Sequence, residues 1–239
     1  MKFDALFFAA HPDDIELSCG GTVIKLSGSG KKTAIVDLTA GELSTRGSLS
    51  IRKRETNNAG RILGINKRFN LGIPDGNIQN NSANRIKIIK IIRELRPDII
   101  FLPHYHDRHP DHFHTHKLVK EAAFYSGLQK IKTTLNGKSQ QAHRPRRNIY
   151  YMQTYTFEPS FIIDISGVFE KKMNAVNCYK SQFFNPSSNE PRTFISDKRF
   201  MDYVKARASF YGFQAGVLYG EAFFIEEKIK LTTKEIFSI

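Results

Sequence analysis

The sequence predicts an α/β fold in which a mainly parallel sheet lies between two layers of helices. Short apolar runs that suit buried strands alternate, over the first hundred residues, with segments of helical periodicity. Such alternation places parallel strands in a sheet that helices cover on both faces. Polar clusters follow two of these apolar runs, and sheets of this kind bind ligands beyond the carboxyl ends of their strands. We therefore expect a Rossmann-like three-layer fold with a site at that edge.

The elements of this alternation follow from the apolar spacing and from the residues that end each segment. The run at 3–10 (FDALFFAA) stops at His-Pro-Asp-Asp, as a buried strand does when it reaches a functional loop. Gly64 and Pro97 are residues that end helices. We predict strands over 3–10, 33–39, 67–71 and 98–103, and helices over 15–29, 50–64 and 82–95.

The pattern is weaker after residue 126. The segment 129–147 has the composition of a basic, polar loop. Residues 181–194 form a loop rich in Pro and Asn that could cover or shape a pocket. The other candidates are strands over 148–157 and 160–166 and helices over 166–180 and 196–211. Since no repeat or linker interrupts the chain, we expect one domain over 1–239.

The composition excludes several classes of protein. Cys19 and Cys178 are too few for a disulfide framework, which favours a reducing compartment. No apolar run approaches the ~20 residues that span a bilayer, so the expected location is the cytoplasm, with no membrane partner. The net charge of +13 is scattered and accompanies no nucleic-acid motif. We interpret it as a solvated lysine-rich surface, with a weaker hint of an anionic substrate.

The histidines are clustered in the sequence. Six of the eight lie between residues 104 and 116, and His11 opens the other polar loop. Imidazole is a common ligand of zinc and similar ions. A set of histidines and carboxylates with three protein ligands and one open position is typical of catalytic zinc, whereas structural sites are usually rich in cysteine. The sequence therefore predicts a catalytic metal site.

The residues alone leave the ligand set open. Asp13 and Asp14 are neighbours and cannot point the same way, so one can bind the metal while the other serves as general base. The motif HPDH (109–112) offers two histidines, but His112 and His116 also have the i, i+4 spacing of paired helix ligands. An aspartate after a strand can instead cap the next helix. That interpretation is weaker for two loops at adjacent strand ends.

Two motifs together carry a family resemblance. AAHPDDIELSCGGT and PHYHDRHPDH resemble the LmbE/PIG-L family of zinc-dependent N-acetylglucosaminyl deacetylases, over about residues 3–225. Further matches resemble the bacillithiol-biosynthesis branch, whose members deacetylate N-acetylglucosaminyl malate. These matches are DLTAGELSTRGS, the R-x-x-E of Arg52 and Glu55, LGIPDG, HRP, YKSQF and YGEAF.

The resemblance assigns roles that the residues alone leave open. It implies a Zn²⁺ ion, or Fe²⁺ or another divalent ion that such donors accept, held by His11, Asp14 and His112. Asp13 would be the general base. His109 would stabilise the oxyanion or pass a proton, and Asp111 would orient His109.

The resemblance also implies a substrate contact and an assembly. Arg52 would contact the carboxylates of an anionic glucosaminide, with Arg46 and Arg54 as rivals for that role. Family members form homo-oligomers, often hexamers. Two alternatives are a deacetylase of another N-acetylated sugar, such as chitobiose, and a non-catalytic α/β protein that binds metal.

Overall fold

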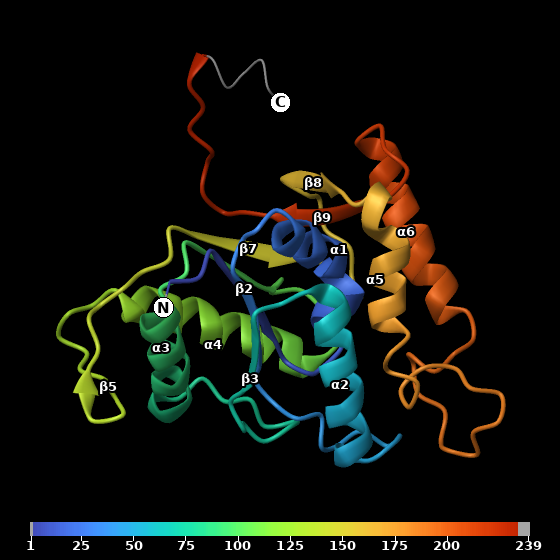
Figure 1. Ribbon diagram of the computed structural model, residues 1–239, viewed down its shortest axis with the longest axis horizontal. Coiled ribbons are helices and arrows are strands. Elements are labelled where there is room, and N and C mark those ends of the chain that lie inside the picture. Colours follow the sequence, from blue (N-terminus) through green and yellow to red (C-terminus); the bar gives the residue numbers. More distant parts are fainter. Residues whose placement is uncertain (1, 234–239) are drawn as a thin grey trace.

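The computed structural model describes residues 2–233 and is built around a twisted sheet (Figure 1). The strands run in the order β3-β2-β1-β4-β7-β9-β8. Their bounds are Lys67–Asn70 (β3), Thr33–Asp37 (β2), Ala5–Ala9 (β1), Ile99–Pro103 (β4), Arg147–Tyr151 (β7), Gly220–Phe224 (β9) and Phe161–Asp164 (β8). Pairing is parallel from β3 to β7, and β9 is antiparallel to both of its neighbours. The predicted mainly parallel sheet is confirmed.

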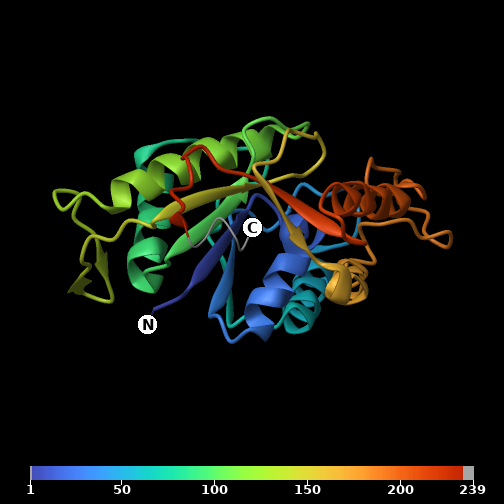
Figure 2. The ribbon, with the colours of Figure 1, turned by 90° about the horizontal axis from the view of Figure 1, so that it is seen from above.

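Helices cover both faces of the sheet (Figure 2). They are α1 (Asp14–Gly28), α2 (Leu49–Leu63), α3 (Ser82–Leu95), α4 (Pro110–Ser126), α5 (Phe169–Val176) and α6 (Phe200–Gln214), with a short 3₁₀ turn at Ser166–Val168. Helices α3 and α4 pack in one core, and α1, α2 and α5 pack in the other. Helix α6 lies against β9 and β8, beside α5.

Strand β1 shows why the sheet has two cores. Leu6 and Phe8 belong to the core under α3 and α4, whereas Phe7 belongs to the core under α1 and α2. A strand that is buried on both faces reads as a continuous apolar run rather than as an alternation. This explains the unbroken ALFFA of β1.

The structure agrees with the predicted elements up to β4 within one or two residues. Gly64, for example, ends α2 in the left-handed conformation with φ 73°, which glycine adopts without strain. Beyond residue 126 the predictions are less accurate. Only 148–151 of the expected strand 148–157 is a strand, as part of β7, and the predicted helix 196–211 begins at Phe200. The predicted loop 129–147 contains a hairpin of β5 (Thr134–Leu135) and β6 (Lys138–Ser139).

The strand order fixes where a site can form. The chain proceeds from β1 to β2 and β3 on one side, and β4 joins β1 on the other side. Ligands of open α/β sheets bind at such a switch point, beyond the carboxyl ends of the strands. The loops after β1 and β4 carry HPDD and HPDH, so the two motifs meet there. No helix within residues 2–233 is long and apolar enough to cross a membrane.

Candidate active site

A pocket of about 520 Å³ opens at this switch point. Its walls come from the loops after β1, β2, β3, β4 and β7, from α1, α2, α4 and α6, and from Gln182 and the 193–195 segment. It is lined by most of the predicted site residues, namely His11, Asp13, Asp14, Arg52, His109 and His112. The two motifs, about a hundred residues apart in sequence, therefore form one site.

Asp14 lies between two imidazole rings. Its Oδ2 accepts the backbone N–H of His11 at 2.9 Å and lies 3.8 Å from Nδ1 of the same ring. Its Oδ1 lies 3.3 Å from Nε2 of His112. The carboxylate and these two ring nitrogens thus converge on one small space.

The opposite nitrogen of each ring is held by carboxylates. Nε2 of His11 lies 3.0 Å from Oδ1 of Asp75 and 3.2 Å from Oδ2 of Asp111. Nδ1 of His112 lies 2.8 Å from Oδ1 of Asp107. A carboxylate that accepts a hydrogen bond from one ring N–H orients the ring, and in the neutral ring the other nitrogen is then the unprotonated one, as in carboxylate–histidine–metal groups. The nitrogens left for a ligand are therefore Nδ1 of His11 and Nε2 of His112.

The surrounding carboxylates make this space attract cations. Burial disfavours a charged His11 ring, but the hydrogen bonds with Asp111 and Asp75 prevail and raise its pKa to about 10. Burial likewise opposes a charged His112, yet the negative charge of Asp14 and the bond to Asp107 raise its pKa to about 9. A site that holds protons this tightly also favours a metal cation, which competes with protons for the same nitrogens.

The donor set fits a divalent metal. Ring nitrogens of His11, His109 and His112 lie within 4.8 Å of one another, and the Asp14 carboxylate adjoins two of these rings. Imidazole and carboxylate donors suit zinc, and they also suit iron and manganese. The residues thus form a potential metal-binding site whose chemistry does not select one metal.

Asp13 has an unusual backbone. Its φ is 110°, and although it is the N-cap residue of α1 its side chain makes no capping hydrogen bond. The carboxylate points instead to Arg52, whose Nη2 donates to Oδ2 at 2.9 Å. Burial raises the pKa of Asp13 to about 7, and the positive charge of Arg52 opposes that rise. The helix-cap interpretation of its carboxylate is therefore wrong.

His109 is the N-cap residue of α4. Its Nδ1 accepts the backbone N–H of Asp111 at 3.2 Å, which places the proton of a neutral ring on Nε2. Burial, reinforced by the nearby rings of His11 and His112, lowers the pKa of His109 and keeps the ring neutral. The ring can therefore act as a hydrogen-bond donor through Nε2.

The expectation that the Asp111 side chain orients His109 needs correction. The Asp111 carboxylate accepts the backbone N–H of Gly76 at 2.9 Å and contacts His11. Only its backbone N–H reaches His109, because HPDH begins a helix whose first N–H groups turn toward the capping residue.

Comparison with known proteins identifies the family. Residues 6–123 match the model described as "PIG-L: GlcNAc-PI de-N-acetylase". The diacetylchitobiose deacetylase of Thermococcus kodakarensis is 30% identical over 221 residues, which cover 88% of this chain and 78% of that protein. The chain belongs to the PIG-L (LmbE) family. It is accordingly an N-deacetylase, a hydrolase of an N-acetyl amide bond.

Two further proteins are similar to this chain over most of its length. The conserved protein TT1542 from Thermus thermophilus has a solved structure that superposes with a TM-score of 0.85 at 35% identity, covering 97% of this chain and 98% of that one. A probable N-acetyl-α-D-glucosaminyl L-malate deacetylase 2 of Bacillus cereus is 26% identical over 196 residues, or 76% of this chain and 84% of that protein.

The structure distinguishes the three arginines that are candidates for the substrate contact. Arg46 is buried and donates to the carbonyls of Ser181 and Pro191 at 3.0 and 3.1 Å, so it holds the 181–194 loop. Arg54 is exposed and does not line the pocket, whereas Arg52 lines it.

Several residues in or beside the pocket were not predicted from the sequence. Arg108 and Arg207 line the pocket. Arg108 lies within the histidine-rich motif, whereas the sequence around Arg207 carries no sign of the site. Asp75 and Asp107 hold the two histidines. Asp107 could have been found, because carboxylates commonly accompany metal-binding histidines and it lies within the histidine-rich loop.

The other histidines of this loop lie outside the pocket lining. His116 is buried with its Nδ1 2.9 Å from the carbonyl of Pro103, so it does not form an i, i+4 pair with His112 at the site. His104 is also buried, and its Nδ1 accepts the backbone N–H of His106. His114 is exposed.

Proposed function

We propose that this chain is a metal-dependent deacetylase of N-acetylglucosaminides, with N-acetylglucosaminyl malate of bacillithiol biosynthesis as its substrate. The proposal is carried by the position of Asp14 between Nδ1 of His11 and Nε2 of His112, with the carboxylate of Asp13 beside it in the same pocket. This arrangement provides three ligands and one additional base, which amide hydrolysis at a metal requires.

The proposed ligands are Nδ1 of His11, a carboxylate oxygen of Asp14 and Nε2 of His112. When bound, a divalent metal would supply a Lewis acid for the acetyl carbonyl and would lower the pKa of water to roughly 7. His109 also lies within reach of the two histidines. We exclude it from the ligands because its Nδ1 already accepts a backbone N–H and its neutral Nε2 carries the proton.

Asp13 is the proposed general base. Its carboxylate would accept a proton from the water whose oxygen attacks the acetyl carbon. The same proton would then pass to the sugar nitrogen as the C–N bond breaks, which yields acetate and a free amine. A positioned acid or base of this kind contributes ~10²–10⁴-fold to the rate. The raised pKa of Asp13, about 7, suits a group that must both accept and release a proton near neutral pH.

His109 is the proposed donor to the oxyanion. Negative charge develops on the acetyl oxygen as water adds to the carbonyl, and a preorganised N–H stabilises that charge. His109 lines the pocket with its Nδ1 already bonded, so the Nε2–H of the neutral ring is available for the oxygen.

An anionic substrate is supported by the charge of the pocket. Arg108 and Arg207 line it together with Arg52, and the chain carries a net charge of +13. Although Asp13, Asp14 and Asp75 also line the pocket, these guanidinium groups can bind substrate carboxylates. The B. cereus relative bears N-acetylglucosaminyl malate in its name, which agrees with that charge.

A second candidate substrate is diacetylchitobiose. The T. kodakarensis relative is named for it. One wall of the pocket carries the rings of Phe194, Phe200 and Tyr203, which offer large rigid contact surfaces for a second sugar ring.

Acetate release from the two substrates tests these proposals. The purified protein is assayed with N-acetylglucosaminyl malate, diacetylchitobiose and plain N-acetylglucosamine, with and without a chelator, and the chelated protein is then reloaded with Zn²⁺ or Fe²⁺. We expect chelation to abolish turnover, reloading to restore it, and the malate conjugate to give the highest kcat/KM. Preference for diacetylchitobiose would replace the malate assignment, and turnover that survives complete metal removal would overturn the mechanism.

A further inference from the structure

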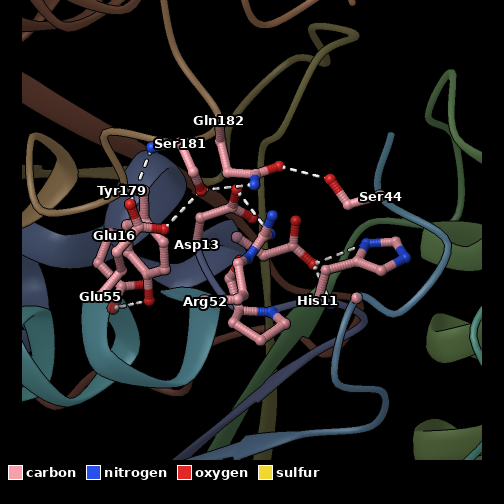
Figure 3. Close-up of polar contacts among 12 residues, drawn as sticks. His11, Asp13, Glu16, Ser44, Arg52, Glu55, Tyr179, Ser181 and Gln182 are labelled. Atoms are coloured by element: carbon pink, nitrogen blue, oxygen red, sulfur yellow. Dashed lines mark hydrogen bonds and ion pairs between the residues drawn. The ribbon is translucent and has the colours of Figure 1, made fainter. Parts of the chain in front are cut away.

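We propose that Arg52 is a positioning residue for Asp13 and that Tyr179 and Glu55 hold Arg52 in place (Figure 3). This inference rests on the proposed function, in which Asp13 is the general base. It differs from the role that the family resemblance implies for Arg52, a contact with substrate carboxylates.

The contact between Arg52 and Asp13 restrains a strained residue. Nη2 of Arg52 donates to Oδ2 of Asp13 at 2.9 Å and also to the carbonyl of Pro12. Asp13 has φ 110°, a region that non-glycine residues occupy only where the surroundings enforce it. One guanidinium nitrogen thus binds both the side chain of the strained residue and the carbonyl that precedes it.

The guanidinium is supported on one face by an aromatic ring. Cζ of Arg52 lies 5.6 Å from the centroid of the Tyr179 ring, within the range of a cation–π contact. The Tyr179 hydroxyl donates to Oε1 of Glu16 at 3.0 Å, and that oxygen also accepts Nη1 of Arg68 at 2.6 Å. The Tyr179 ring is therefore held in position through its hydroxyl, which contacts the charged pair of Glu16 and Arg68.

The helix that carries Arg52 is fixed by Glu55, one turn further along α2. Glu55 accepts the backbone N–H of Ser181 at 2.8 Å and its hydroxyl at 2.7 Å. Gln182 donates to the Ser181 hydroxyl at 2.8 Å and accepts the hydroxyl of Ser44 at the same distance. Figure 3 shows these contacts in the neighbourhood of Asp13 and Arg52. The R-x-x-E and YKSQF motifs therefore meet here, through Glu55 with Ser181 and through Arg52 with Tyr179.

Arg52 lines the pocket, but this geometry disfavours a contact between its Nη2 and a substrate carboxylate. Arg52 is only 7% exposed, and its hydrogen bonds to Asp13 and Pro12 both come from Nη2. A substrate carboxylate at that nitrogen would compete with the proposed base. Loss of Arg52 should therefore impair the chemical step rather than substrate binding.

The test compares Arg52→Gln and Arg52→Lys with Arg54→Gln, which changes an exposed arginine of the same helix. kcat and KM are measured with N-acetylglucosaminyl malate and with uncharged diacetylchitobiose, and Zn²⁺ affinity is measured by calorimetry. We expect Arg52→Gln to lower kcat about 10²-fold on either substrate, the loss typical of a catalytic group misplaced by about 1 Å. KM and Zn²⁺ affinity should stay unchanged, Arg52→Lys should restore part of kcat, and Arg54→Gln should behave as wild type.

Three results would overturn the proposal. A rise of KM confined to the malate conjugate would make Arg52 a substrate contact. A loss of Zn²⁺ affinity in a folded variant would make its role a support of the metal site. Wild-type kinetics in Arg52→Gln would show that Arg52 contributes neither to catalysis nor to substrate binding.

A second pair of variants covers the case in which Arg52→Gln does not fold. Tyr179→Leu removes the ring from the guanidinium, whereas Tyr179→Phe keeps the ring and loses only the hydroxyl. We expect a lower kcat at unchanged KM for Tyr179→Leu and a value near wild type for Tyr179→Phe. Equal kcat in Tyr179→Leu and wild type would count against the proposal.

A crystal structure separates this inference from the proposed function. If the wild-type protein deacetylates none of the sugars, the proposed function fails. The structure of Arg52→Gln still reports on positioning, since Asp13 should leave φ near 110° and its carboxylate should move. An unchanged Asp13 in that structure would overturn the inference alone.

Discussion

Oδ1 of Asp107 lies 2.8 Å from Nδ1 of His112, and the other ring nitrogen of that histidine faces Asp14 at 3.3 Å. Asp75 likewise contacts a ring nitrogen of His11, but the nitrogen there is Nε2. Each histidine is therefore held by an aspartate at the nitrogen that faces away from Asp14. These two aspartates determine which nitrogens can bind a cation.

Asp107→Asn should weaken metal binding without unfolding the protein. An amide has nearly the shape of the carboxylate but lacks the charge that holds the ring proton, and loss of such a partner typically costs 10–100-fold in metal affinity. Zn²⁺ affinity is measured by competition with a chromogenic chelator. Asp202→Asn, an exposed change on α6, is the control. Equal affinity in the two variants would show that Asp107 does not support His112.

Variants of Asp13 and Asp14 should differ in their effects on turnover and on metal binding. Asp13→Asn should retain the metal and lose about 10²–10⁴-fold in kcat, because the general base is gone. Asp14→Asn should lose metal as well, because the ligand between the two rings is weakened. Metal content by mass spectrometry and kcat are measured on the same samples. If both variants keep equal metal and equal activity, the two roles are assigned incorrectly.

His109→Gln tests the oxyanion donor. Removal of one such donor typically costs about 10²–10³-fold in kcat, and glutamine can still accept the N–H of Asp111 that His109 now accepts. We expect kcat to fall while metal affinity stays the same. His114→Gln, an exposed change on the same helix, serves as the control. A loss of metal in His109→Gln would make His109 a ligand.

The fold was predictable up to β4 because each element there has a local signal. Apolar runs, glycine stops and isoleucine spacing are properties of neighbouring residues, and the parallel pairing follows from the alternation of strands and helices. Strand β9 has no such signal: GEAFF pairs antiparallel with β7 and β8, which lie far away in the sequence. Its strand conformation depends on those partners, since strand formation depends strongly on context.

The location of the site could be predicted from the sequence, but the hydrogen bonds between its side chains could not. HPDD and HPDH follow adjacent strands, so their meeting followed from topology. The contacts of Asp111 with His11 and of Arg52 with Asp13 depend on side-chain directions that spacing does not specify. Asp75 reaches His11 from a loop 64 residues away. Zinc as the metal, the malate substrate and a homo-oligomer remain predictions.

His104 should make stability depend on pH. The ring is 5% exposed and lies 4.4 Å from the Phe157 ring, centroid to centroid. Burial lowers its pKa from 6.5 to about 4. Between these values the unfolded chain binds a proton that the folded chain does not bind, so the contribution of His104 to the free energy of unfolding falls as the pH drops from about 6.5 toward about 4.

His104→Gln removes this titration and retains an acceptor for the N–H of His106. We expect wild type to lose more stability than His104→Gln between about pH 7 and about pH 5, with urea unfolding at each pH as the measurement and excess chelator present throughout. His114→Gln, which changes an exposed histidine, is the control and should follow wild type. Parallel pH profiles for wild type and His104→Gln would mean that the His104 ring takes up its proton equally in the folded and unfolded chain.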